Sequence, residues 1–157
     1  MLFALSTGAS LFDTPSLELS AEAGRRWGSW GLVGKLEWNP WLRFAGEDKL
    51  VKGVLDIGVG GEYLFFDDRC RTAVAVGMSR LQFDTEIDKK GRKGLFFDVV
   101  PVGLRYPLGG GGDGGEPGGF TLRFDPLTFH FIEPVIDDVI PLVVFEYRTR
   151  VAIEWTP

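Results

Sequence analysis

The sequence is poor in several residues on which common functions depend. Its 157 residues contain one cysteine, Cys70, and one histidine, His130, so an internal disulfide is excluded. The 17 basic side chains are outnumbered by 22 acidic ones, which argues against a nucleic-acid partner, because such proteins carry a basic stripe. No apolar run reaches the roughly 18 residues that a transmembrane helix needs. What remains is a chain of single-domain length, residues 1–157, that is rich in glycine and aromatic residues.

Alternation of apolar and polar residues dominates the chain, and helical periodicity is nearly absent. This pattern predicts an all-β fold, because successive side chains of a strand point to opposite faces. A run with eight glycines, 109–119, predicts a flexible loop. The expected strands are Leu2–Leu11, Ser16–Gly24, Trp30–Asn39, Leu50–Phe66, Cys70–Phe83, Gly94–Tyr106, Phe120–Glu133 and Pro141–Trp155. The first has an alternative, since Met1–Ser10 could be the remnant of a trimmed signal peptide.

The composition of the polar face decides between two kinds of barrel. In the last expected strand, Phe145, Tyr147 and Val151 alternate with Arg148 and Arg150. A soluble barrel would turn such charges outward, whereas a transmembrane barrel turns the apolar face to lipid. Glycine and alanine are interleaved with the charges, which makes room for long side chains in a narrow interior. The strand charges are mostly arginine, which suits enclosed ion pairs, and aromatic residues gather near strand ends as in interfacial girdles. We therefore expect an antiparallel up-and-down transmembrane β-barrel.

These features resemble the small bacterial outer-membrane β-barrels of the eight-stranded OmpA and OmpX type. The closing segment, Phe145–Trp155, is similar to the aromatic-ended last strand that such proteins present to their barrel-assembly machinery. The resemblance implies a Gram-negative outer-membrane location, with the lipid bilayer and that machinery as partners. Eight strands of about 9–11 residues fit the chain length. At eight strands the interior is filled by side chains, which argues against a channel for large solutes.

Two prolines interrupt the alternation within expected strands. Pro101 and Pro126 each coincide with a slip of one residue in the inward and outward pattern. A one-residue β-bulge would restore both registers, and bulges tolerate proline. We therefore expect a bulge at each of these prolines.

The charges on the inward face predict an ion-pair network inside the barrel, and the alternation places nine acids and six bases there. The expected network is Glu37, Asp56, Glu62, Arg71, Asp98, Arg105, Arg123, Glu146, Arg148, Arg150 and Glu154, with Glu18, Glu22, Lys35 and Asp125 also inward. Because the first strand carries no charge, Arg148 and Arg150 must reach the seventh strand or cross the lumen to the second, fourth or fifth. Arg150→Ala should then destabilise the barrel far more than Arg92→Ala, within the expected connection Asp84–Lys93.

His130 is the candidate for acid–base catalysis. It could activate Thr128, oriented by Glu133 or Asp125, as in a lipid-modifying hydrolase. Small lipid A deacylases, however, place a serine two residues after the histidine, where this chain has Ile132. The sequence therefore favours the hypothesis that the protein is not an enzyme.

Metal sites have no support in the spacing of the acidic residues. Glu47-Asp48, Asp67-Asp68 and Asp137-Asp138 fall at expected turns, and no motif supplies the ligands of a metal site. We expect no metal and no cofactor.

Three functions remain open. The first is a structural, adhesive or partner-docking barrel of the outer membrane, which is not an enzyme. The second is an outer-membrane lipid-modifying hydrolase built around His130. The third is a soluble, lipocalin-like barrel that binds a ligand. Binding residues and the identity of any protein partner cannot be assigned from the pattern.

Overall fold

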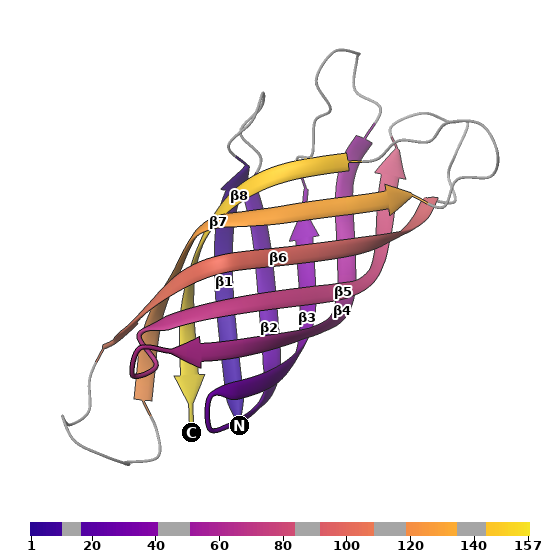
Figure 1. The fold of residues 1–157 in the computed structure, drawn as a ribbon. Coiled ribbons are helices and arrows are strands. Elements are labelled where there is room, and N and C mark those ends of the chain that lie inside the picture. The colour runs from indigo at the N-terminus through magenta and orange to yellow at the C-terminus, as the bar shows by residue number, and fades with distance from the viewer. Residues whose placement is uncertain (11–16, 41–50, 84–91, 109–118, 135–143) are drawn as a thin grey trace.

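The chain forms a closed antiparallel barrel. The computed structural model describes residues 1–10, 17–40, 51–83, 92–108, 119–134 and 144–157. Each strand pairs with its sequence neighbours, and β1 also pairs with β8, which closes the barrel (Figure 1). The strands are β1 (Leu2–Ser10), β2 (Leu17–Trp27), β3 (Trp30–Asn39), β4 (Val51–Phe65), β5 (Cys70–Phe83), β6 (Arg92–Pro107), β7 (Gly119–Pro134) and β8 (Val144–Thr156). The expected up-and-down barrel of eight strands is confirmed, and Leu2–Ser10 is a strand. Among these residues no helix could cross a membrane.

Two strands extend by two or more residues beyond an expected end. β2 continues to Trp27, three residues past Gly24, because Arg25 and Arg26 keep the outward and inward alternation. The chain then turns at Gly28, whose φ of 56° suits a residue without a Cβ. β6 begins at Arg92, which pairs with Leu81, so the expectation that Arg92 lies in a connection is wrong.

The two chain termini lie at the same end of the barrel, together with the β2–β3 and β4–β5 turns (Figure 1). In the β4–β5 turn, Phe66, Asp67 and Asp68 have positive φ angles of 54°, 53° and 61°. Aspartate tolerates this conformation better than most residues, so Asp67 and Asp68 have a backbone role in the turn. The other acidic pairs, Glu47-Asp48 and Asp137-Asp138, lie outside the described residues, as does the glycine run 109–118.

Both expected proline bulges occur, and they lie on neighbouring strands. Between β5 and β6, the pairing passes from Arg71–Gly103 to Ala73–Val100, so β6 has one extra residue at Pro101. Between β7 and β8, it passes from Asp125–Arg150 to Thr128–Arg148, so β7 has one extra residue at Pro126. The bulges return the inward face to Asp98 on β6 and to His130 on β7.

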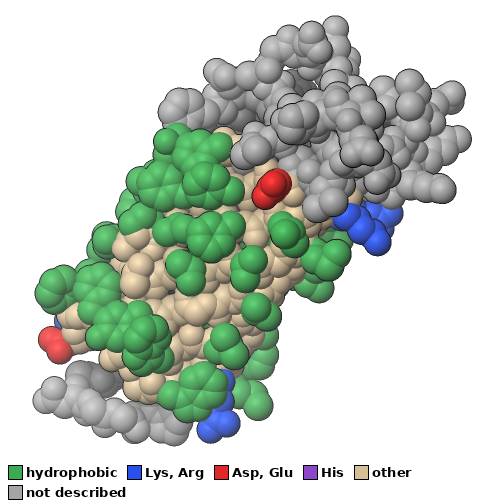
Figure 2. Space-filling model, turned by 45° about the vertical axis from the view of Figure 1, so that its right-hand side comes forward, with side chains coloured by type: hydrophobic (Ala, Val, Ile, Leu, Met, Phe, Trp, Pro, Cys, Tyr) green, Lys and Arg blue, Asp and Glu red, His purple; other side chains and the backbone are tan. Residues whose placement is uncertain are grey.

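The distribution of side chains is inverted relative to a soluble protein. Outward positions are apolar and exposed, such as Ile57 at 61% and Val59 at 57%. Figure 2 shows hydrophobic side chains across the described part of one face, with the charged side chains in view near its ends. Inward positions are charged and buried, such as Glu154 and His130 at 0%. The charged side chains from which a functional site could be built therefore lie in the lumen of the barrel.

Candidate functional site

The lumen brings together all eleven charged residues that the alternation places in a network. None of their side chains is more than 12% exposed; ten of them form an ion pair in the described part of the chain, and Asp56 faces His130 Nε2. Glu18, Glu22, Lys35 and Asp125 join them. These pairs divide into two separate groups, which we call the lower and the upper network.

The lower network lies toward the end that carries the termini, and its charges balance. It consists of the cations Arg26, Arg71, Arg105 and Arg123 and the carboxylates Glu22, Glu62, Asp125 and Glu154. Arg26 is central to it: its Nη2 lies 2.6 Å from Glu62 Oε1 and its Nη1 lies 3.0 Å from Glu154 Oε1. Arg123 donates to Glu22 over 2.8 Å. With four cations and four carboxylates, this half of the lumen requires no further ion.

The upper network lies nearer the opposite end, and acids are in excess. It consists of Lys35, Arg148, Arg150, Glu18, Glu37, Asp56, Asp98, Glu146 and His130. Five carboxylates therefore face three permanent cations. Among the residues of this network that the structure describes, His130 is the remaining group that can carry positive charge.

Arg148 and Arg150 each contact three carboxylates of the upper network, and those of Arg150 lie on three different strands. The guanidinium of Arg150 contacts Glu18, Glu37 at 2.8 Å and Asp98 at 3.2 Å. Those partners come from β2, as expected, and from β3 and β6, which were not expected. The charged face of β8 also reaches β7, through Glu154 and Arg123. The contacts with β3 and β6 have a geometric reason: a long arginine at the centre of a narrow barrel reaches across it, and does not need a neighbouring strand.

Arg26 is the lumen residue that the sequence pattern missed. Ending the second strand at Gly24 removed Arg26 from the alternation, although its side chain is only 16% exposed and pairs with two buried carboxylates. The spacing of Glu18, Glu22 and Arg26 could have predicted this position, because all three have even numbers and therefore lie on the same face of β2.

Apolar side chains lie at the two ends of the charged lumen. Leu2 and Leu64 are 1% exposed and lie near the end that carries the termini. Val54 and Ile132, 1% and 0% exposed, lie toward the opposite end of their strands. A cavity lined by charged residues of the lumen, Lys35 and Arg71 among them, measures about 20 Å³, which is little more than one water molecule occupies. The described lumen is thus filled by side chains.

Several strand glycines make room for the charged side chains. A Cβ on Gly8 would lie 2.6 Å from Glu18 Oε1, 2.9 Å from Arg150 Cγ and 2.8 Å from the carbonyl oxygen of Thr149. A Cβ on Gly31 would lie 2.7 Å from Glu62. Since such distances are too short for real atoms, these positions exclude every larger residue unless the ion pairs move.

Gly8→Ala is expected to destabilise the barrel by about 1–3 kcal/mol, because the backbone oxygen beside it cannot yield as a side chain can. Gly34→Ala is the matched control: its Cβ would have 3.7 Å to the nearest atom, so the change should be neutral or slightly stabilising. Urea unfolding followed by tryptophan fluorescence measures both. Equal effects of the two substitutions would show that Gly8 is not required for packing.

His130 lies inside the barrel, which is not where lipid hydrolysis would need it. Its Nδ1 contacts Asp98, and its Nε2 lies 3.5 Å from Asp56 Oδ2. Of the partners considered for catalysis, Glu133 is exposed on the other face of β7, and Thr128 Oγ1 forms no hydrogen bond with the described residues. Glu133 therefore lies on the opposite face of β7 from His130, whereas Thr128 and Asp125 share its inward face, where Asp125 pairs with Arg71.

The fold and the lumen together define a small eight-stranded barrel with an apolar exterior and an ion-paired, filled interior. Among solved structures, the chain is similar to the crystal structure of Neisserial surface protein A (NspA), with a TM-score of 0.57 and 11% sequence identity. The match covers 98% of this chain and 91% of that one, so it includes the whole barrel and supports the resemblance at the level of the fold. No protein-family description and no curated protein matches the sequence.

Proposed function

We propose that this chain is a structural barrel of the bacterial outer membrane, which spans the bilayer and presents its connections for adhesion or for docking a protein partner. The observation that carries the proposal is the inversion of the barrel. Thirty large hydrophobic residues are exposed on the described surface, while the charged groups of the two networks are buried. In water this arrangement would be unfavourable on both faces, whereas in lipid the apolar exterior is solvated and the charges pair inside.

Aromatic residues near the strand ends support a membrane position. Trp30 and Tyr63 lie 4.8 Å apart, ring centre to ring centre, at the end that carries the termini. Phe131 and Phe145 lie 4.6 Å apart toward the other end. Aromatic girdles at both interfaces are typical of transmembrane barrels. Trp41 lies outside the described residues, but Trp27, Trp30 and Trp155 are all exposed on the outer surface.

The filled lumen supports a role other than the transport of large solutes. Charged side chains pair across it, and Leu2, Leu64, Val54 and Ile132 lie at its ends. A lipocalin-like function would need an apolar chamber of at least about 300 Å³, which this charged interior does not resemble. The proposed partners are therefore the bilayer around the barrel, the assembly machinery that would receive β8, and a protein bound at the connections.

The test is membrane dependence. Protein refolded from urea is expected to need detergent or lipid, to migrate faster on SDS gels before boiling than after it, and to fractionate with outer membranes in a Gram-negative host. Liposomes that contain it should exclude large sugars. A monomer that stays folded and soluble in plain buffer would refute the proposal. Fatty-acid release from lipids by the wild type, lost in His130→Ala, would favour the hydrolase instead.

A further inference from the structure

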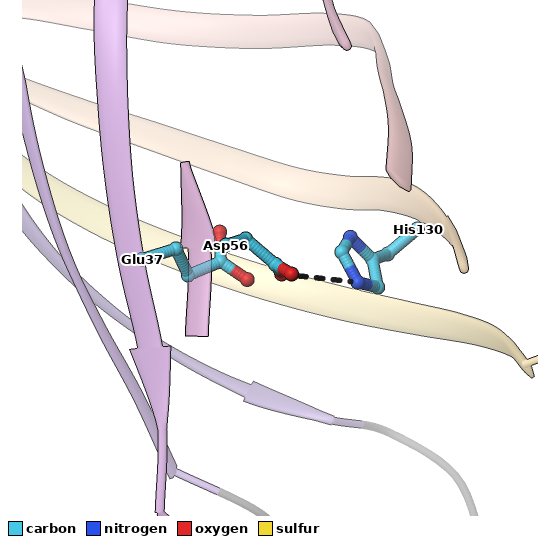
Figure 3. Close-up of side chains that lie close together, drawn as sticks. All are labelled: Glu37, Asp56 and His130. Carbon is cyan, nitrogen blue, oxygen red and sulfur yellow. Dashed lines mark ion pairs between the residues drawn. The ribbon is translucent and has the colours of Figure 1, made fainter. Parts of the chain in front are cut away.

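Three buried side chains of the upper network lie close together, and two of them have a polar atom without a hydrogen-bond partner among the described residues. Glu37 on β3, Asp56 on β4 and His130 on β7 offer ligand atoms that all lie within 4.8 Å of one another (Figure 3). All three residues are at most 1% exposed. Asp56 Oδ1 and His130 Nε2 form no hydrogen bond with the described residues. Leaving such groups unpaired costs about 1–3 kcal/mol each, so a partner is expected.

The contacts of His130 define which of its nitrogens is available. Asp98 accepts a hydrogen bond from Nδ1, so in a neutral imidazole the lone pair lies on Nε2 and is directed at Asp56. Figure 3 shows the Asp56 carboxylate and the imidazole pointing toward each other, with Glu37 beside Asp56. A lone pair 3.5 Å from a carboxylate oxygen is repulsive unless a cation lies between them. A carboxylate that orients a histidine through its second nitrogen is the usual outer support of a metal ligand.

The charge of the upper network points to a divalent ion. Among its described residues, before His130 is counted, five carboxylates and three cations leave an excess of two negative charges, whereas the lower network balances. We propose that His130 Nε2 and the Asp56 carboxylate bind a divalent first-row transition metal, such as Zn²⁺, with Glu37 as a third ligand. Imidazole with carboxylates suits these metals better than Ca²⁺ or Mg²⁺, which prefer oxygen alone.

Glu37 is the most heavily shared of the three ligands. Its oxygens already accept contacts from Lys35 at 2.6 Å, from Arg150 at 2.8 Å and from Arg148. A carboxylate has about four lone-pair positions, so one remains for the ion. His130 and Asp56 therefore hold the metal, and Glu37 ties it to the arginines of β8.

The test measures zinc retained by the barrel. Protein without a polyhistidine tag is refolded in detergent with Zn²⁺, passed over a mild chelator and analysed by mass spectrometry of the metal. The wild type should retain about one zinc per chain, and His130→Ala should lose it. Asp98→Asn should weaken the affinity by about 10–100-fold, because it replaces the carboxylate that orients His130 through Nδ1, and it also removes a partner of Lys35 and Arg150. Glu133→Gln, which removes a carboxylate from the exposed face of the same strand, should bind as the wild type does.

A second measurement uses the wild type alone, in case a variant fails to fold. Because His130 is the only histidine, its imidazole gives one pair of ¹⁵N signals. Zinc should move the Nε2 signal while Nδ1 stays protonated. Folded wild type that retains no zinc would overturn the proposal, as would zinc that His130→Ala still binds. Two protonated nitrogens with or without zinc would show that a proton, and not a metal, separates His130 from Asp56.

Discussion

Arg150→Ala is expected to lower the free energy of unfolding by about 3–5 kcal/mol, because it removes a buried cation that three buried carboxylates share. Glu18, Glu37 and Asp98 would all lose a partner at once. Arg80→Ala is the control, since Arg80 is an exposed arginine of β5 and its loss should stay within about 0.5 kcal/mol. Urea unfolding in lipid vesicles measures both. Equal, small effects would mean that the charged face is solvated, and the inverted barrel would fail with it.

The Arg150 effect should also be coupled to its carboxylates. Glu18→Gln alone removes a buried charge that contacts Arg148 and Arg150. Combined with Arg150→Ala, it should cost less than the sum of the two single changes, by about 0.5–3 kcal/mol. Additive effects would indicate that Glu18 and Arg150 do not interact in the folded protein. This cycle tests the ion pair itself, whereas the single substitution also includes lost packing.

Val76→Arg is expected to destabilise the barrel in lipid by about 2–4 kcal/mol, because it places a charge on the middle of the proposed lipid-facing surface. Val76 lies at the middle of β5, beside the outward residues Val59 and Phe97 of the adjacent strands. Leu108→Arg, just beyond β6, is the matched control and should cost about 0–1 kcal/mol. The two positions are equally exposed, at 50% and 51%.

That equal exposure makes the comparison decisive. On the surface of a water-soluble barrel, both substitutions would fall within about 0.5 kcal/mol of neutral. In a bilayer, the two substitutions are expected to differ because Val76 lies nearer the bilayer midplane than Leu108 does. Unfolding of the two variants in vesicles of the same lipid therefore distinguishes a membrane barrel from a soluble one, independently of where the protein is found in a cell.

Most of the fold was predictable because strand periodicity is local. Alternation identified eight strands, and the slips at Pro101 and Pro126 identified both bulges, since a register change is visible within one strand. The ends of strands were less certain. Arg26 and Arg92 lie beside turn-forming or charged residues, and only pairing with the neighbouring strand shows that the chain is still extended there.

The partners inside the lumen could not be predicted in the same way. Alternation says that Glu37, Asp56 and His130 point inward, but it does not say at what height or how near to one another. That depends on the stagger of strands around the closed barrel, which β3, β4 and β7 together determine. The adjacent acids Asp67 and Asp68 lie in a turn, whereas the cluster that could hold a metal is assembled from residues 19 and 74 positions apart.

The span of the ion pairs has a consequence for how the barrel is made. Arg150 and Glu18 are separated by 132 residues, and Arg26 and Glu154 by 128. Before β1 meets β8, a hairpin of β7 and β8 would carry Arg148 and Arg150 into an apolar phase with Glu146 as their nearest carboxylate on the same strand. We therefore expect that a partly closed barrel is not a populated intermediate of folding. Closure of the sheet and entry into the bilayer are expected to occur as one cooperative event.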